Sequence, residues 1–221
     1  MIVTMDGPAG SGKSTIARAV AQQLQIPYLD TWAMYRALAY AMLGRGIDLA
    51  DEAAVVTAIR SVDLDVDCGV TQTRVRVDGD DVTDSIRTME VAAATSKVAS
   101  FPGVRELMIQ HQRRIGSALG SFVSEGRDQG GVVFPNADAS FFLDASLTER
   151  AQRRFRELES GAKLVAIEDV LDNISSRDKM DEKQWKPLLD SGRAIVVDTT
   201  GMTIQAVVDR ILELLPGGSD R

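Results

Sequence analysis

Cysteine and histidine are almost absent from this chain of 221 residues, which has one of each, Cys68 and His111. A single cysteine cannot form an intramolecular disulfide, and it cannot supply the cysteine cluster of a structural metal site. A single histidine excludes zinc sites built on several histidines and most Ser-His nucleophile chemistry. We expect His111 to be a surface residue on a helix, so any catalysis must come from other side chains.

Long apolar runs and an excess of positive charge are also missing. No stretch approaches the roughly 20 apolar residues of a membrane span, and the N-terminus lacks the pattern of a signal peptide. The formal net charge is −7, which argues against a general nucleic-acid or anionic-membrane surface. We therefore expect a soluble, cytoplasmic protein that binds neither nucleic acid nor membrane, with a sizeable core.

The sequence does contain a glycine-rich segment near its start, where residues 7–14 read GPAGSGKS. An apolar run precedes this segment and a helical pattern follows it, so it matches the phosphate-binding loop in full. In such a loop the backbone N–H groups approach a phosphate, Lys13 reaches the β- and γ-phosphates and the Ser14 hydroxyl is a ligand of Mg²⁺. The residues predicted to bind a nucleoside triphosphate are Gly7, Pro8, Ala9, Gly10, Ser11, Gly12, Lys13, Ser14 and Thr15.

Strand and helix patterns alternate along most of the chain. Strands are predicted near residues 2–5, 26–29, 122–124, 140–144 and 194–198, and helices follow most of them, including segments 148–159, 166–179 and 203–215. Residues 62–83 differ, because they alternate with period two around an Asp-Gly turn signal and predict a small antiparallel sheet. We expect a three-layer α/β fold with a central parallel sheet flanked by helices and ligands at the carboxyl ends of its strands.

Arginine is far commoner than lysine, with 19 residues against 6. Genome base composition could explain the bias, and so could the suitability of guanidinium groups for bidentate phosphate binding. A run of arginines on a helix, such as Arg150, Arg153, Arg154 and Arg156, is commonly a solvated face. Beside a phosphate-binding loop the same residues could offset the charge of two phosphates, since two like charges 4 Å apart repel by about 4 kcal/mol at an effective dielectric near 20. A phosphate acceptor is already an oxyanion, so it would need no general base.

Motifs along nearly the whole chain resemble the bacterial cytidylate kinases, a family in the nucleoside monophosphate kinase group of P-loop kinases. The matching stretches are residues 6–14, 28–31, 33–37, 86–88, 126–128, 132–135, 149–154 and 198–201, with Ser96, Arg105, Arg177, Asp178 and Asp181. The resemblance implies a single P-loop kinase domain over residues 1–221, with a monophosphate-binding region at about 31–105, its antiparallel insert at about 62–83 and a short helical lid at about 151–165. It further implies transfer of a phosphoryl group from ATP, with Mg²⁺, to CMP or dCMP.

The same resemblance implies roles for residues outside the phosphate-binding loop. Lys13, Arg127, Asp128, Arg153 and Arg177 would be the catalytic residues, the arginines bridging the two phosphates. The predicted CMP-binding residues are Thr31, Arg36, Ser96, Arg105, Arg127, Asp128 and Asp181, of which Ser96, Arg105 and Asp128 would read the cytosine or position what does, and Asp181 would reach the sugar.

Two positions depart from the family pattern. Trp32 stands where the family has glycine, and it either packs on the core or crowds the acceptor site. Gln184 stands where the family usually has arginine, so one phosphate contact is lost or supplied elsewhere, for example by Lys183 or Lys186. The neighbouring Trp185 could stack on a base or pack the end of its helix.

Two other functions remain open at this point. The chain could be a P-loop kinase of UMP or of a small hydroxyl metabolite such as shikimate, for which Asp30 or Asp128 could serve as base. It could instead be a nucleotide-sensing module, although Lys13 and the lid arginines are retained and no guanine-binding motif is found. We expect a monomer.

Overall fold

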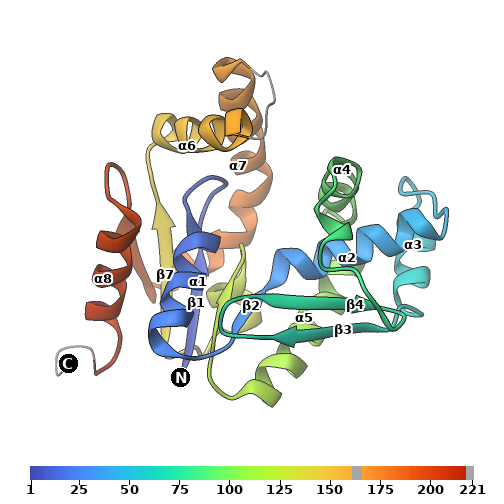
Figure 1. Ribbon diagram of the computed structural model, residues 1–221, viewed down its shortest axis with the longest axis horizontal. Helices are drawn as coiled ribbons and strands as arrows, with labels where there is room; N and C mark the ends of the chain where they lie inside the picture. The colour runs from blue at the N-terminus through green and yellow to red at the C-terminus, as the bar shows by residue number, and fades with distance from the viewer. Residues whose placement is uncertain (161–165, 218–221) are drawn as a thin grey trace. The chain divides into compact units, whose positions relative to one another are not determined.

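The computed structural model describes residues 1–160 and 166–217, and it divides by its contacts into two compact units (Figure 1). The first unit comprises Met1–Leu24 and Val123–Arg221, and the second comprises Gln25–Phe122. The interpretation of residues 1–221 as a single domain stays a prediction.

Parallel strands form the centre of the first unit. β1 (Ile2–Asp6) lies between β6 (Phe122–Glu125) and β7 (Ala139–Asp144), and β8 (Ala194–Asp198) follows β7. The β1–β7 and β7–β8 pairs are parallel, with Met5 opposite Phe141 and Phe141 opposite Ile195. The last four residues of β1 and all of β6 are buried, as expected for strands covered on both faces.

Four helices accompany these strands: α1 (Lys13–Leu24), α6 (Leu147–Ser160), α7 (Ile167–Asp190) and α8 (Ile204–Leu214). α1 contacts α8, and α6 packs against α7 (Figure 1). α7 also contacts η2, a π-helical turn at Gln129–Val133. This arrangement confirms the predicted α/β fold, with helices flanking a central parallel sheet.

Helix α7 is longer than the sequence predicts. The expected helix ends at residue 179, whereas α7 continues through Pro187 to Asp190. The buried residues Ile174, Asp181, Trp185 and Leu188 lie on one face of it, so core packing extends the helix in spite of the proline. The ring of Trp185 packs edge-on against Phe142 of β7 at 6.0 Å between centroids, and Trp185 therefore packs the helix rather than facing solvent.

The second unit begins with β2 (Tyr28–Asp30) and α2 (Thr31–Gly44), followed by α3 (Glu52–Ile59). The Asp30 carboxylate caps α2 by accepting a hydrogen bond from the backbone N–H of Ala33 at 2.9 Å. The 3₁₀ turn η1 (Ser85–Arg87) and the helices α4 (Met89–Val98) and α5 (Pro102–Leu119) complete its helical part. α2 packs against α4.

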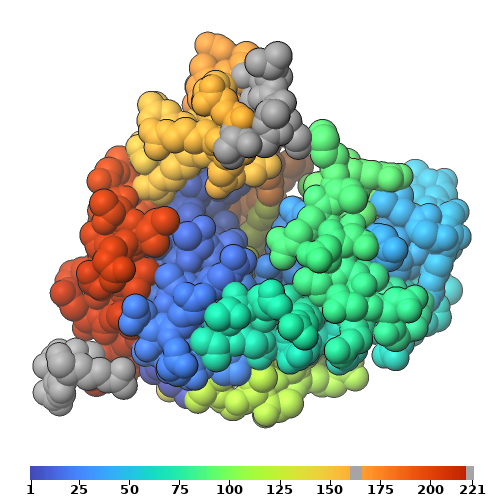
Figure 2. All heavy atoms as spheres, viewed as in Figure 1, coloured from blue at the N-terminus to red at the C-terminus, as the bar shows by residue number. Residues whose placement is uncertain are grey.

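Residues 62–83 contain the predicted antiparallel sheet. Its strands are β3 (Leu64–Cys68), β4 (Thr73–Val77) and β5 (Asp80–Asp81), in that order. Asp78 and Gly79 join β4 to β5 with φ angles of +52° and +90°, the conformation of a two-residue hairpin turn. In Figure 2 the teal atoms of this sheet are visible on the surface.

His111 lies on a helix, α5, as predicted, and it is half-buried there. Its Nδ1 lies 2.9 Å from a guanidinium nitrogen of Arg114. Burial lowers the pKa of His111, and the charge of Arg114 acts in the same direction. The residue belongs to the packing of α5 in the second unit.

Candidate active site

The glycine-rich segment forms the turn between β1 and α1, as the motif requires. Gly7, Gly10 and Gly12 all have positive φ angles, of 150°, 77° and 88°. At Gly7 a Cβ atom would lie 2.2 Å from the backbone oxygen of Leu143, so no side chain fits there. The N-terminal end of α1, which starts at Lys13, carries the positive end of the helix dipole and favours an anion.

The side chain of Lys13 folds back onto the phosphate-binding loop. Its ammonium donates a hydrogen bond to the backbone oxygen of Pro8 at 3.0 Å. Burial lowers the pKa of Lys13 to about 8, the charge of Glu125 opposes this shift, and the nearby Arg127 and Arg177 add to it. The negative charge of a bound phosphate would offset the repulsion among Lys13, Arg127 and Arg177.

Ser14 meets a carboxylate that the sequence did not identify. Its hydroxyl donates a hydrogen bond to Glu125 at 2.9 Å, and Glu125, the last residue of β6, is buried. Hydroxyl and carboxylate oxygens suit Mg²⁺, which usually takes only one or two protein ligands and completes its shell with water and substrate phosphates. Among residues 1–160 and 166–217 no group of three or more His, Cys, Asp or Glu could hold a metal by itself. The pair therefore fits a magnesium ion that arrives with the nucleotide.

Asp6, the last residue of β1, is a second buried carboxylate, and the sequence analysis assigned no role to it. It is fully buried, and its two oxygens accept hydrogen bonds from the backbone N–H groups of Gln129 at 2.8 Å and Gly130 at 2.7 Å. Burial raises the pKa of Asp6 to about 7 against these hydrogen bonds. Asp6 thus holds the turn that follows Arg127 and Asp128 next to the start of the phosphate-binding loop.

Arg127 and Asp181 form an ion pair near the loop. Arg127 Nε lies 2.8 Å from Asp181 Oδ2, and both side chains are largely buried. Burial lowers the pKa of Arg177, and the charge of Arg127 acts in the same direction. Burial raises the pKa of Asp181, and the charges of Arg127, Arg177 and Lys13 oppose the rise. The structure therefore gathers Lys13, Arg127, Arg177 and Asp181, all predicted site residues, into one charged cluster.

Arg153 lies on α6 and joins two loops of the first unit. Its guanidinium donates to the backbone oxygen of Ser11 at 3.4 Å, to the Thr199 hydroxyl at 3.0 Å and to the Thr199 backbone oxygen at 2.7 Å. It also pairs with Glu149 at 3.0 Å. Arg153 therefore contacts the phosphate-binding loop, as a site residue should, and its role in bridging phosphates stays a prediction. The predicted lid at 151–165 lies partly on α6, and its residues 161–165 lie outside the described residues.

Gln184 lies one turn beyond Asp181 on α7. With its amide oriented to satisfy its surroundings, its nitrogen donates to the Asp181 backbone oxygen at 3.1 Å and to Asp181 Oδ1 at 3.3 Å. Lys186, one suggested replacement for the missing arginine, pairs with Asp190 at 2.8 Å on the exposed side of the helix. The substitution thus leaves an amide, not a cation, beside Asp181.

Asp128 is buried in the first unit, where its Oδ1 accepts a hydrogen bond from the side-chain amide of Gln129 at 3.1 Å. The other predicted acceptor residues, Thr31, Arg36, Ser96 and Arg105, lie in the second unit. Thr31, the first residue of α2, is buried, whereas Ser96 on α4 is exposed and Arg105 on α5 is half-buried. Arg36 on α2 donates to the backbone oxygen of Ile86 at 3.3 Å. Trp32 lies 6.0 Å from Tyr35 between ring centroids in a tilted arrangement. The packing of α2 against both α4 and η1 brings these elements together within this unit.

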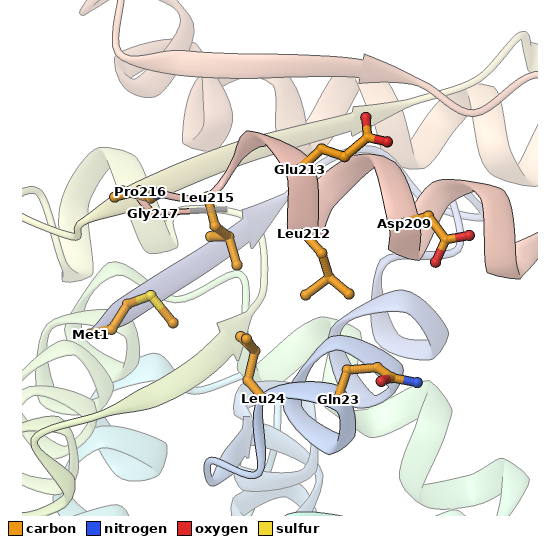
Figure 3. Close-up of a pocket in the computed structure, with 9 residues that line it drawn as sticks. All are labelled: Met1, Gln23, Leu24, Asp209, Leu212, Glu213, Leu215, Pro216 and Gly217. Carbon is orange, nitrogen blue, oxygen red and sulfur yellow. The ribbon is translucent and has the colours of Figure 1, made fainter. Parts of the chain in front are cut away.

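A cavity of about 360 Å³ lies at the other end of α1 (Figure 3). Met1, Leu24, Leu212 and Leu215 line it together with the carboxylates Asp209 and Glu213. Among the described residues that line it, none is a lysine or arginine, so they offer no match for a phosphate. The charged cluster around the phosphate-binding loop is the better candidate for the active site.

A phosphate-binding loop at the carboxyl end of β1, with a lysine and arginines gathered near it, defines a P-loop phosphoryl-transfer enzyme. The family model described as cytidylate kinase matches residues 3–216. The chain is 42% identical to the cytidylate kinase of Desulfitobacterium hafniense (strain Y51), over 96% of this chain and 91% of that protein. It is 40% identical to the cytidylate kinase of Clostridioides difficile (strain 630), over 96% of each. The chain belongs to the cytidylate kinase family.

Among solved structures, an uncharacterized protein from Eubacterium ventriosum ATCC 27560 superposes with a TM-score of 0.53. It is 12% identical to this chain and covers 100% of it, with 99% of that chain aligned. At this identity the likeness concerns the fold alone. Within the described parts of the chain, no helix is long and apolar enough to cross a membrane.

Proposed function

We propose that the chain transfers the γ-phosphoryl group of ATP to CMP or dCMP, giving ADP and CDP or dCDP. Membership of the cytidylate kinase family supports this activity. The observation within the structure that carries it is the cluster of Lys13, Arg127 and Arg177, because three neighbouring cations can offset the charge of a triphosphate donor and a monophosphate acceptor together. The cytoplasmic location and the monomeric state stay predictions from the sequence.

The donor would be held by residues 7–15. In this loop the glycines allow close backbone approach, and Lys13 would contact the β- and γ-phosphates. Ser14 and Glu125 would hold Mg²⁺, which when bound neutralises charge on the phosphate oxygens. The hydrogen bond between Ser14 and Glu125 orients the hydroxyl before the nucleotide arrives.

The acceptor would be bound by Thr31, Arg36, Ser96, Arg105, Arg127, Asp128 and Asp181. Arg127 and Arg177 would offset the repulsion between the acceptor phosphate and the triphosphate, which amounts to about 4 kcal/mol per pair of charges at 4 Å. Arg153 would add to this charge or hold the donor site through Ser11. Since the attacking group is a phosphate oxygen, positioning and electrostatics suffice, and no general base is assigned.

An acceptor panel tests this proposal. ADP release from Mg²⁺-ATP would be followed with CMP, dCMP, UMP, AMP, GMP and shikimate, each at several concentrations. We expect turnover with CMP and dCMP well above that with the other acceptors. Preferential turnover of shikimate would point to a metabolite kinase, and ATP binding without transfer to any acceptor would point to a sensing module.

A further inference from the structure

Arg150 is a buried arginine on α6 whose side chain is committed to protein contacts. It is 6% exposed. Its Nε donates to the backbone oxygen of Ala145 at 3.0 Å, and its Nη1 donates to the backbone oxygen of Ala9 at 3.0 Å. The same Nη1 lies 2.7 Å from Asp178 Oδ2 on α7. Arg150 therefore links the phosphate-binding loop to α7 through one guanidinium.

We propose that Arg150 and Asp178 are positioning residues that fix the shape of the phosphate-binding loop for the triphosphate. They do this without touching the nucleotide, unlike the other arginines assigned to the site. The inference rests on the proposed function only in taking ATP as the ligand of the loop.

The peptide between Ala9 and Gly10 explains how a distant guanidinium can act on phosphate binding. In a trans peptide the C=O and N–H groups point in opposite directions. Drawing the Ala9 carbonyl towards Arg150 therefore turns the Gly10 N–H away from α6. A Cβ atom on Gly10 would lie 3.1 Å from the Arg150 backbone oxygen and 3.2 Å from its Cβ, so the same residue also packs closely on this turn of the loop. Backbone N–H groups are the donors with which such loops cradle phosphates.

Asp178 forms its close ion pair with Arg150, although its charge also acts on Arg177 and Asp181. One carboxylate oxygen pairs with Arg150, and the other is buried without a hydrogen-bond donor there. Removing either partner alone would leave a charge buried and unpaired. Because Asp178 is the neighbour of Arg177 in α7, the pair also ties the loop to the helix that carries a predicted catalytic arginine.

The test separates positioning from simple stability by comparing single and double variants. Arg150→Met and Asp178→Asn each break the pair, and Arg150→Met with Asp178→Leu removes both charges together. Arg150→Lys keeps the charge but loses the planar fork that serves several acceptors at once. Arg210→Met is the matched control, because Arg210 forms an exposed pair with Glu213 on α8. For each protein we would measure the thermal unfolding midpoint and the dissociation constant of a non-hydrolysable ATP analogue with Mg²⁺, without acceptor.

We expect Arg150→Met to weaken analogue binding at least tenfold, Arg150→Lys at least threefold, and Arg210→Met less than twofold. The unfolding midpoint of the double variant should lie well above that of Arg150→Met, since no unpaired charge remains. Its binding of the analogue should still be at least tenfold weaker than that of the wild type. Wild-type affinity in the double variant, or in folded Arg150→Lys if the methionine variant does not fold, would overturn the proposal.

The outcome is independent of the acceptor. If the wild-type chain binds the analogue but does not phosphorylate CMP, the proposed function fails while the positioning test still stands. A wild-type chain that does not bind the analogue would overturn both.

Discussion

Ser14 and Glu125 lie 111 residues apart in the chain and meet through one hydrogen bond at the start of α1. We expect Glu125→Gln to raise the Mg²⁺ concentration needed for half-maximal activity at least tenfold, because the amide keeps the shape but lacks the charge that favours the cation. Mg²⁺ titration of activity at fixed ATP measures the effect, and Glu213→Gln on the exposed face of α8 is the control. Equal Mg²⁺ dependence in Glu125→Gln and wild type would remove Glu125 from the site.

Lys13 gives the donor site a dependence on pH. Because its pKa in the free protein lies at about 8, Lys13 is largely charged at pH 7 and loses its proton as the pH rises through 8. A bound triphosphate favours the charged form, so ATP binding at pH 9 should take up close to one proton and weaken as the pH rises further. Calorimetric titration in two buffers of different ionisation enthalpy measures this uptake. Lys13→Met should show none, and equal heats in both buffers for the wild type would contradict the assignment.

Asp6 makes the free energy of unfolding depend on pH, because its pKa is raised in the folded protein. Its pKa is raised from 3.8 to about 7, so the folded protein keeps a proton that the unfolded chain releases near pH 4. This contribution to the free energy of unfolding is present in full below pH 4 and is lost as the pH rises towards 7, by up to about 1.4 kcal/mol per pH unit. Denaturant unfolding at pH 5 and pH 8 should therefore show a steeper loss in wild type than in Asp6→Asn. An equal decrease in the free energy of unfolding between pH 5 and pH 8 in the two proteins would contradict the raised pKa of Asp6.

The sequence predicts the residues of a local motif better than the partners that come from elsewhere in the chain. Residues 7–14 form the expected turn because strand, glycines, lysine and helix are contiguous. Glu125 and Asp6 show no comparable signal, since a carboxylate at the end of a strand is common and its partner depends on strand order. The same reason explains why the role of Arg150 could not be distinguished from that of Arg153 by spacing alone.

At the scale of elements, the β4–β5 turn offers a prediction about stability. Gly79 has a φ angle of +90°, where a side chain is strained, although a Cβ atom would meet no neighbour within 4 Å. We expect Gly79→Ala to destabilise the chain by about 1 kcal/mol and to lower the unfolding midpoint by a few °C. Gly44→Ala is the matched control, because Gly44 lies in α2 with open space around it and without positive φ. An unchanged thermal unfolding midpoint in Gly79→Ala would contradict the positive φ angle of Gly79 in this turn.

Periodicity predicted which elements exist and missed where one of them ends. The alternation in residues 62–83 and the turn at Asp78 and Gly79 were sufficient for the small sheet. The predicted helix ended at residue 179, but in α7 Trp185 and Leu188 are buried in the first unit. Tertiary packing of this kind has no signature in local propensity, and it extended the helix beyond the prediction.

At the scale of the whole molecule, the family and the charged cluster support one central claim. The cytidylate kinase family model covers residues 3–216, and the two departures noted in the sequence, Trp32 and Gln184, lie outside the phosphate-binding loop. Gln184 places an amide beside Asp181. The phosphate-binding loop concerns only the ATP donor. The central claim is therefore that the acceptor is a cytidine monophosphate.

Chromatographic quantification of nucleotides during turnover of Mg²⁺-ATP with CMP tests this claim most directly. The account predicts that CDP and ADP accumulate in equal amounts while ATP and CMP disappear together, and that dCMP gives dCDP in the same way. Accumulation of ADP and inorganic phosphate without CDP would mean transfer to water, and it would contradict the claim that the chain is a kinase of cytidine monophosphates.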